Sequence, residues 1–143
     1  MILQIIYGFF ATIGFGILFN VPKKYIIEAG FSGAIGWAGY LLMMHISKST
    51  IAATFIASIF IGIMGEFFAK RTKNPVTIFI IPAIIPLVPG VASYKTIKAL
   101  IDGKNKEALS LGILTAGIAL AISSGLILVI SFFRIRSQKQ SWK

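Results

Sequence analysis

Five long stretches of the chain contain no Asp, Glu, Lys or Arg, and this feature constrains the fold more than any other. Their lengths run from 17 to 26 residues, close to the roughly 17–25 apolar residues that an α-helix needs to cross a bilayer. The stretches cover residues 1–22, 29–47, 49–65, 74–94 and 108–133. They are continuously apolar rather than alternating, which favours helices over a transmembrane barrel. The pattern predicts an all-α, polytopic helical membrane protein with about five transmembrane segments.

The composition excludes several other classes of protein. The 143 residues are 57% hydrophobic and 13% charged, whereas a soluble domain has about 25% charged residues. The net charge of +10 comes from Lys and Arg residues that separate the apolar stretches, so it does not form a nucleic-acid-binding surface. The chain has no Cys, one His and no paired carboxylates. We therefore expect no enzyme, no catalytic site, no metal site, no cofactor and no nucleic-acid partner.

We expect one integral membrane domain over residues 1–143. The predicted segments are residues 2–20, 25–45, 50–70, 75–90 followed by a helix over 91–102, and 106–134. Small residues recur at three- and four-residue spacing in the second, third and last of them. Such spacings let helix backbones approach closely in lipid. They predict close packing, either within the chain or against a partner.

The Lys and Arg residues divide unevenly between the two sides of the membrane. If all five segments cross, nine of the fourteen basic residues lie on the side of the C-terminal tail, residues 134–143. The excess of positive charge places that side in the cytoplasm. If the fourth segment re-enters instead of crossing, the division is again nine to five, but the tail lies outside. With five crossings we expect the inner (plasma) membrane, with the N-terminus outside and the C-terminus cytoplasmic.

The fourth segment is unusual because Pro82, Pro86 and Pro89 interrupt it. Each proline removes a backbone hydrogen bond in a helix, which should leave the carbonyls of Ile78, Pro82 and Ile85 without amide partners. Backbone of this kind at membrane depth must be buried in protein or line a water-filled cavity. A second helix can begin after Gly90, and its first amides, at residues 91–94, should be free donors.

Half-helix N-termini of this kind bind anionic groups in several transporter folds. We therefore predict a carboxylate ligand held by Pro82, Pro86, Pro89, Gly90, Ser93 and Tyr94. The alternative is a kinked structural helix followed by an interfacial amphipathic one.

Glu66 is the membrane-embedded acid that most invites a functional interpretation. It either pairs with Lys70 one turn later at the membrane interface, or acts as a coupling or gating carboxylate. In the second case Arg71 or Lys70 would be its partner.

Several short stretches together resemble the threonine/serine exporter family, and more narrowly the small membrane subunit of its split, two-subunit type. They are Phe-Asn-Val-Pro-Lys-Lys at 19–24, Gly-Ala-Ile-Gly-Trp at 33–37, Gly-Glu at 65–66 with Arg71, Ile-Pro at 81–82, and Leu-Val-Pro-Gly at 87–90 with Tyr94. The Leu-Val-Pro-Gly after a proline-broken helix is the most specific of them. The resemblance extends over nearly the whole chain.

The resemblance implies a secondary exporter built from two five-helix halves, which some systems divide between two subunits. This chain would supply one half and would work with a larger membrane subunit of the same family, with further copies of itself, or with both. Threonine and serine are known substrates of the family, and a related split system exports succinate. The implied substrate is therefore a small carboxylate metabolite. The alternative function is a non-transporting membrane scaffold or assembly subunit.

Overall fold

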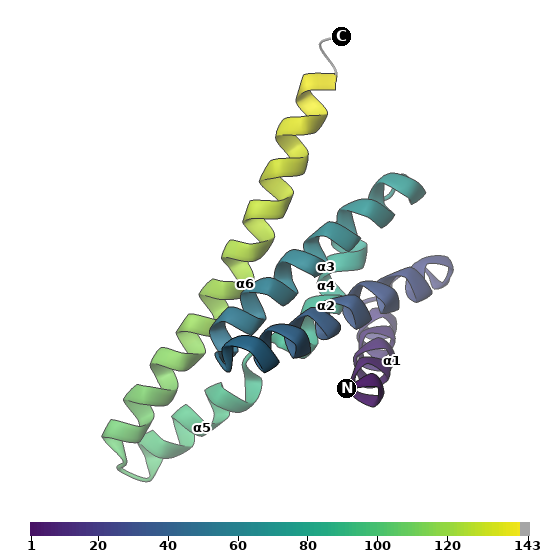
Figure 1. Cartoon of the computed structure of the whole chain (residues 1–143). Coiled ribbons are helices and arrows are strands. Elements are labelled where there is room, and N and C mark those ends of the chain that lie inside the picture. The colour runs from purple at the N-terminus through teal and green to yellow at the C-terminus, as the bar shows by residue number, and fades with distance from the viewer. Residues whose placement is uncertain (141–143) are drawn as a thin grey trace.

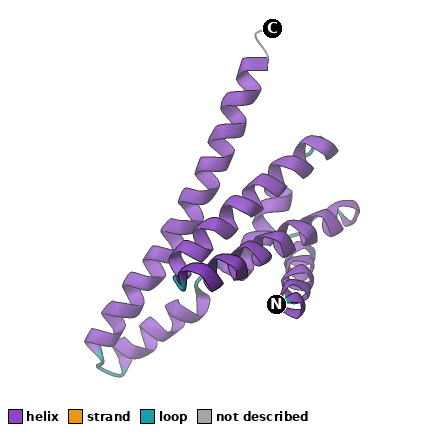
Figure 2. Ribbon diagram, in the orientation of Figure 1, coloured by secondary structure: helices purple, strands orange, loops and turns teal. Residues whose placement is uncertain are grey.

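The computed structural model describes the backbone of residues 1–140 and the side chains of residues 1–135. This part of the chain is helical and contains no strand (Figures 1 and 2). Its elements in chain order are α1 (Ile2–Leu18), the 3-10 turn η1 (Lys23–Tyr25), α2 (Ile26–Ser47), α3 (Thr50–Thr72), α4 (Thr77–Ile84), the 3-10 turn η2 (Ile85–Leu87), α5 (Gly90–Ile101) and α6 (Asn105–Gln140). The predicted all-α membrane class, with a broken fourth segment, is confirmed.

Three helices are long and apolar enough to cross a membrane. They are Lys23–Ser47, Thr50–Thr72 and Asn105–Ile135. The pair Thr77–Leu87 and Gly90–Ile101, bent by 45° at its break, adds a fourth crossing if it is one span. Helix α1, with 17 residues, is shorter. Among the described residues the structure therefore supports three to four spans, and the count of five stays a prediction.

Helix α3 lies between α2 and α6, α1 packs against α2, and α5 runs back along the first turns of α6 (Figure 1). Helix α4 packs against α1, α2 and α3. Side chains of α4 and η2 form one core with those of α3 and α6: Ala57, Ile61, Ile80, Ala83, Leu87, Ile118 and Ile122. The broken segment is thus the centre of the bundle, while α6 projects beyond the other helices.

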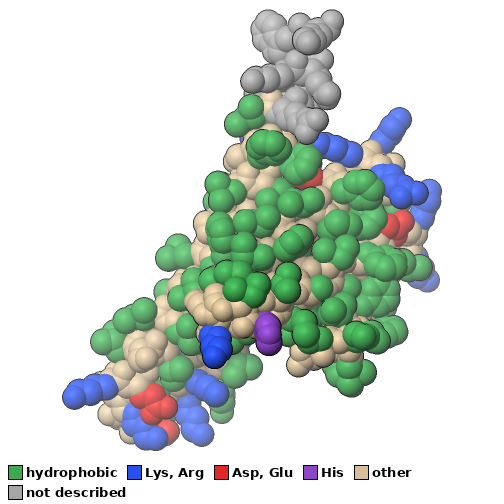
Figure 3. Space-filling view, in the orientation of Figure 1, with side chains coloured by type: hydrophobic (Ala, Val, Ile, Leu, Met, Phe, Trp, Pro, Cys, Tyr) green, Lys and Arg blue, Asp and Glu red, His purple; other side chains and the backbone are tan. Residues whose placement is uncertain are grey.

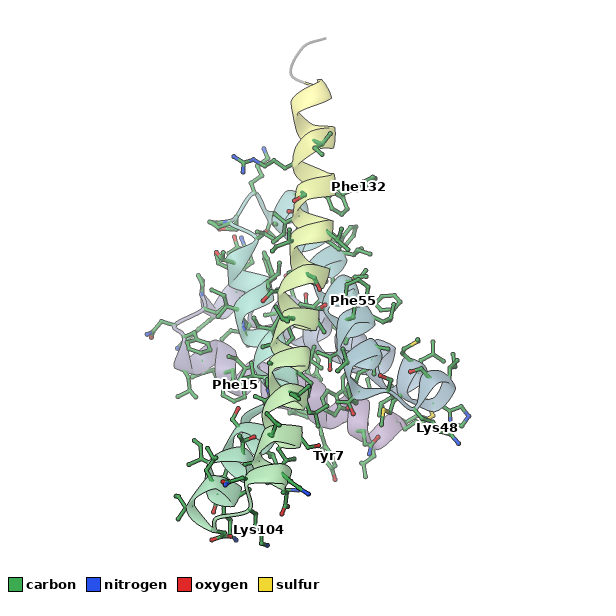
Figure 4. All side chains as sticks on the ribbon, turned by 90° about the vertical axis from the view of Figure 1, so that its left-hand side faces the viewer. Tyr7, Phe15, Lys48, Phe55, Lys104 and Phe132 are labelled. Atoms are coloured by element: carbon green, nitrogen blue, oxygen red, sulfur yellow. The ribbon has the colours of Figure 1, made fainter. Side chains whose placement is uncertain are left out.

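Charged side chains gather at two ends of the molecule, with hydrophobic side chains between them (Figure 3). Lys48 and Lys104 mark one end, and Phe132 lies toward the other (Figure 4). This distribution is typical of a protein that crosses an apolar layer. The side chains of residues 136–143, which contribute to the basic tail used for the predicted orientation, lie outside the described residues.

Glycines set the distance between neighbouring helices. A Cβ atom on Gly33 of α2 would overlap Thr12 of α1, and one on Gly125 of α6 would overlap Ser58 of α3. Thr12 and Ser58 are fully buried at these contacts. The Ser58 hydroxyl donates to the Phe55 carbonyl oxygen at 2.7 Å, so it has a partner in its own helix. The predicted close approach through small residues therefore occurs within this chain.

Gly125→Ala is expected to destabilise the bundle by about 1–3 kcal/mol, because the new Cβ would meet the backbone carbonyl oxygen of Phe55 as well as Ser58. Gly14→Ala is the matched control, since nothing lies within 4 Å of its Cβ position. For both variants, the midpoint is the temperature at which half of the monodisperse protein is lost on heating in detergent micelles. Gly125→Ala should have the lower midpoint; equal midpoints would show that α3 and α6 are not held this closely.

Candidate functional site

The break in the fourth segment has a defined backbone geometry. Pro82 lies inside α4, Pro86 lies in the η2 turn, and Pro89 precedes the first residue of α5. Val88 is extended, with φ −61° and ψ 133°, and so separates the two helical parts. The chain continues into α5 at Gly90 after this extended step.

Two backbone expectations for this break need correction. The Ile85 carbonyl is not free, because it accepts a hydrogen bond from the Val88 amide at 3.1 Å. The Ser93 amide is not free either, since it donates to the Pro89 carbonyl at 2.9 Å. The 3-10 turn and the first bond of α5 satisfy these groups. Among the described residues, no hydrogen-bond acceptor is found for the amides of Val91 and Ala92.

A cavity of about 310 Å³ surrounds the start of α5. Four parts of the chain line it: α2, α3, the residues from η2 into α5, and α6. The lining residues are Trp37, Tyr40, Thr50, Thr54, Pro86, Leu87, Val88, Pro89, Gly90, Val91, Ala92, Lys95, Leu111, Leu114 and Ile118. Most are apolar, so the few polar groups decide what the cavity can hold.

These polar groups are mainly hydrogen-bond donors. Val91 and Ala92 present the two amides at the positive end of the α5 dipole. Lys95 adds an ammonium group one turn further along α5. Thr50 and Thr54 line the α3 side, and the Thr54 side chain is only 1% exposed. Hydroxyl groups both donate and accept, so the cavity best matches a small molecule with negatively charged oxygen atoms.

The structure brings three of the six predicted substrate residues to this cavity, namely Pro86, Pro89 and Gly90. The other three lie outside its lining. Pro82 is buried, with its Cβ about 4.0 Å from the position of a Cβ on Gly16 of α1.

Ser93 and Tyr94 are also absent from this lining. The Ser93 hydroxyl donates to the Pro89 carbonyl at 2.8 Å and so completes the first turn of α5. The Tyr94 side chain is 67% exposed on the outer face of α5.

Sequence reasoning missed four residues that reach the cavity from α2 and α3, and one on α5 itself: Trp37, Tyr40, Thr50 and Thr54, and Lys95. The spacing of Thr50 and Thr54 by four residues, inside an apolar stretch, was the available signal, because such a pair shares one helix face. No comparable pattern in the sequence predicts that residues of α2 lie beside the start of α5.

Glu66 lies away from this cavity and has no ion-pair partner among the side chains that the structure describes. It is half-buried on α3, twelve residues after Thr54, which is roughly 18 Å along a helix axis. Among the described residues the one ion pair joins Lys104 and Glu107, at 3.9 Å. The expected pair of Glu66 with Lys70 is therefore not formed.

The partners proposed for Glu66 are placed elsewhere. The Lys70 ammonium lies over the ring of Phe133, 4.1 Å from its centroid, in a cation–π contact. The Arg71 side chain is exposed. Within residues 1–135, Glu66 is thus a half-buried acid with no basic partner, and its coupling role stays a prediction.

Comparison with known proteins identifies the class of this membrane protein. The family model described as "Threonine/Serine exporter, ThrE" matches residues 4–132, nearly the whole chain. The chain belongs to this family, and it is a membrane protein of the exporter type. An uncharacterized protein of Haemophilus influenzae is 29% identical over 102 residues, which are 71% of this chain and 34% of the relative. This chain thus spans about a third of that relative's length. No solved structure matches.

Because the chain has no cysteine, a single introduced thiol can test whether the cavity holds water. Ala92→Cys is expected to react with N-ethylmaleimide in permeabilised membranes, since thiolates form and react where water reaches. Ala57→Cys, at a core position with 0% exposure, is the control and should stay unmodified. A gel shift with maleimide-polyethylene glycol after denaturation measures the thiol that remains. Equal protection of both thiols would show that the start of α5 is sealed.

Proposed function

We propose that this chain is the membrane subunit of a secondary exporter for small carboxylate metabolites, such as threonine, serine or a dicarboxylate like succinate. The observation that carries the proposal is the cavity at the start of α5, with its two free amides, two threonine hydroxyls and one lysine. Hydrogen bonds to a charged group contribute about 1.5–3 kcal/mol each. Two amides and a nearby ammonium can therefore replace much of the hydration of one carboxylate.

The proposal includes a larger membrane subunit of the same family, further copies of this chain, or both. It rests on the resemblance to the small membrane subunit of the split type. It is also supported by the exposed apolar side chains along α1 and α6, which would lie against lipid or a second subunit. In such an exporter the broken helix stays near the midplane while the two halves move around it.

We further propose the inner membrane as the location, with the N-terminus outside and the C-terminus in the cytoplasm. The uneven distribution of Lys and Arg supports this orientation. The cavity would then bind a metabolite produced inside the cell and release it outside.

Gly90→Leu tests the cavity as the transport site. Nothing lies within 4 Å of a Cβ at Gly90, so the leucine side chain should enter the cavity without displacing its neighbours. We expect export of labelled threonine, serine and succinate to fall to the level of cells that lack the chain. Gly14→Leu, which also adds its side chain to open space but on α1 outside this cavity, should leave export unchanged.

The export assay needs the chain in its cellular context, with membrane levels of each variant measured by immunoblot. Wild-type export by Gly90→Leu at normal membrane levels would contradict the proposed site. If cells with and without the chain also export all three metabolites equally, the scaffold alternative becomes the better account.

Glu66→Gln tests a coupling role for the half-buried acid. If Glu66 exchanges a proton during transport, the glutamine variant should show a flatter dependence of export on external pH than the wild type. Glu107→Gln is the control, because Glu107 is exposed and paired with Lys104. Export rates between pH 5.5 and 8 would be compared for the three chains. Parallel profiles for Glu66→Gln and the wild type would return Glu66 to a structural role.

A further inference from the structure

Four polar side chains of the described residues are almost completely buried: Thr12, Ser32, Thr54 and Ser58. Three of their hydroxyls donate to a backbone carbonyl oxygen of their own helix, at distances of 2.7 to 3.2 Å. The Thr54 hydroxyl is the exception, because no hydrogen-bond partner is found for it within residues 1–135. Burying a hydroxyl without a partner costs free energy, and most such groups in native proteins are paired. The unpaired Thr54 hydroxyl therefore requires a physical explanation.

The Thr54 oxygen faces open space and not other protein atoms. Four other threonines, at positions 12, 72, 96 and 115, donate to the carbonyl oxygen four residues earlier in their helix. In the described part of the chain, the side-chain atoms that are both covered and unpaired belong to Trp37 and Glu28. The Thr54 Oγ1 atom is not one of them, so it keeps accessible surface although the residue is only 1% exposed. Since Thr54 lines the 310 Å³ cavity, its hydroxyl opens into that cavity.

The same cavity contains the donors at the start of α5. The amides of Val91 and Ala92 have no acceptor among the described residues, and Lys95 adds an ammonium group. Thr54 reaches the cavity from α3, which packs against α2, α4 and α6, whereas α5 packs against α6. A small molecule in the cavity can therefore be bound from α3 and from α5 at the same time.

We propose that Thr54 is a substrate-binding residue. Its hydroxyl donates to an oxygen of the metabolite outside the carboxylate that the α5 amides and Lys95 bind, so the metabolite bridges α3 and α5. A molecule without this second oxygen would leave the buried hydroxyl unpaired, and the contact therefore favours ligands that carry two oxygen-bearing groups. This inference rests on the proposed export function and adds a residue to the site.

The experiment separates the hydroxyl of Thr54 from its shape. Thr54→Val keeps the branched side chain and removes the hydroxyl, whereas Thr54→Ser keeps the hydroxyl and removes the methyl group. Thr115→Val is the control, because Thr115 lies outside the cavity lining and its hydroxyl donates to the Leu111 carbonyl at 2.8 Å. Membrane vesicles from cells producing each chain would be loaded with increasing concentrations of labelled threonine, serine or succinate. The initial efflux rates then give the half-saturating concentration, which does not depend on the amount of chain in the membrane.

We expect Thr54→Val to raise the half-saturating concentration roughly tenfold or more, as loss of a hydrogen bond to a charged or strongly polar group does. Thr54→Ser should stay within about threefold of the wild type, because only a methyl group is lost. Thr115→Val should match the wild type.

Two results would overturn the role of Thr54 and leave the export function standing. One is an unchanged half-saturating concentration for Thr54→Val. The other is an equal rise for Thr54→Val and Thr54→Ser, since the packing of the side chain and not its hydroxyl would then matter. If wild-type vesicles release none of the three metabolites faster than vesicles without the chain, the proposed function itself fails, and the role of Thr54 fails with it.

Discussion

The structure depends on one constraint, that backbone with a broken hydrogen-bond ladder must be kept away from lipid. Three prolines interrupt the fourth segment between Pro82 and Pro89. The surrounding helices bury the α4 part of this segment, where Phe79 and Ala83 are 0% and 2% exposed, whereas Val88 at the break is 48% exposed. The other helices are arranged around it, because unsatisfied peptide groups cost several kcal/mol each in hydrocarbon. Helix α4, which contains Pro82, accordingly packs against α1, α2 and α3.

Enclosing this segment requires the long helices to approach closely, and the glycines make that approach possible. The missing side chain at Gly33 leaves room for Thr12 of α1, and the one at Gly125 leaves room for Ser58 of α3. Apolar burial gives little driving force between helices in lipid, so packing at short distance must supply the stability. The same packing leaves an open volume where α5 begins, since Gly90 has no neighbour within 4 Å of its Cβ position. The cavity is thus a consequence of the break and not an independent feature.

The sequence predicted the helices and the break well, because apolar length and proline positions are local properties. It predicted the site only in part. Pro86, Pro89 and Gly90 line the cavity because they form the break. The Ser93 hydroxyl instead donates a hydrogen bond to the Pro89 carbonyl oxygen in the first turn of α5. Trp37 reaches the cavity from a distant part of the chain, and no local pattern specifies that contact. Length alone does not decide whether α1 crosses the membrane, since its 17 residues lie at the lower limit for a transmembrane helix.

The chemistry of the cavity bears on which substrate the proposed exporter would take. In the described part of the chain, its charged group is Lys95, and its other strong donors are the α5 amides. A dicarboxylate finds donors for both of its ends among these groups. An amino acid also carries an ammonium group, for which the side-chain acceptors in the described lining are the hydroxyls of Tyr40, Thr50 and Thr54. If the proposed function is export of threonine or serine, these hydroxyls or a second subunit would have to bind the ammonium group, a requirement that a dicarboxylate does not impose.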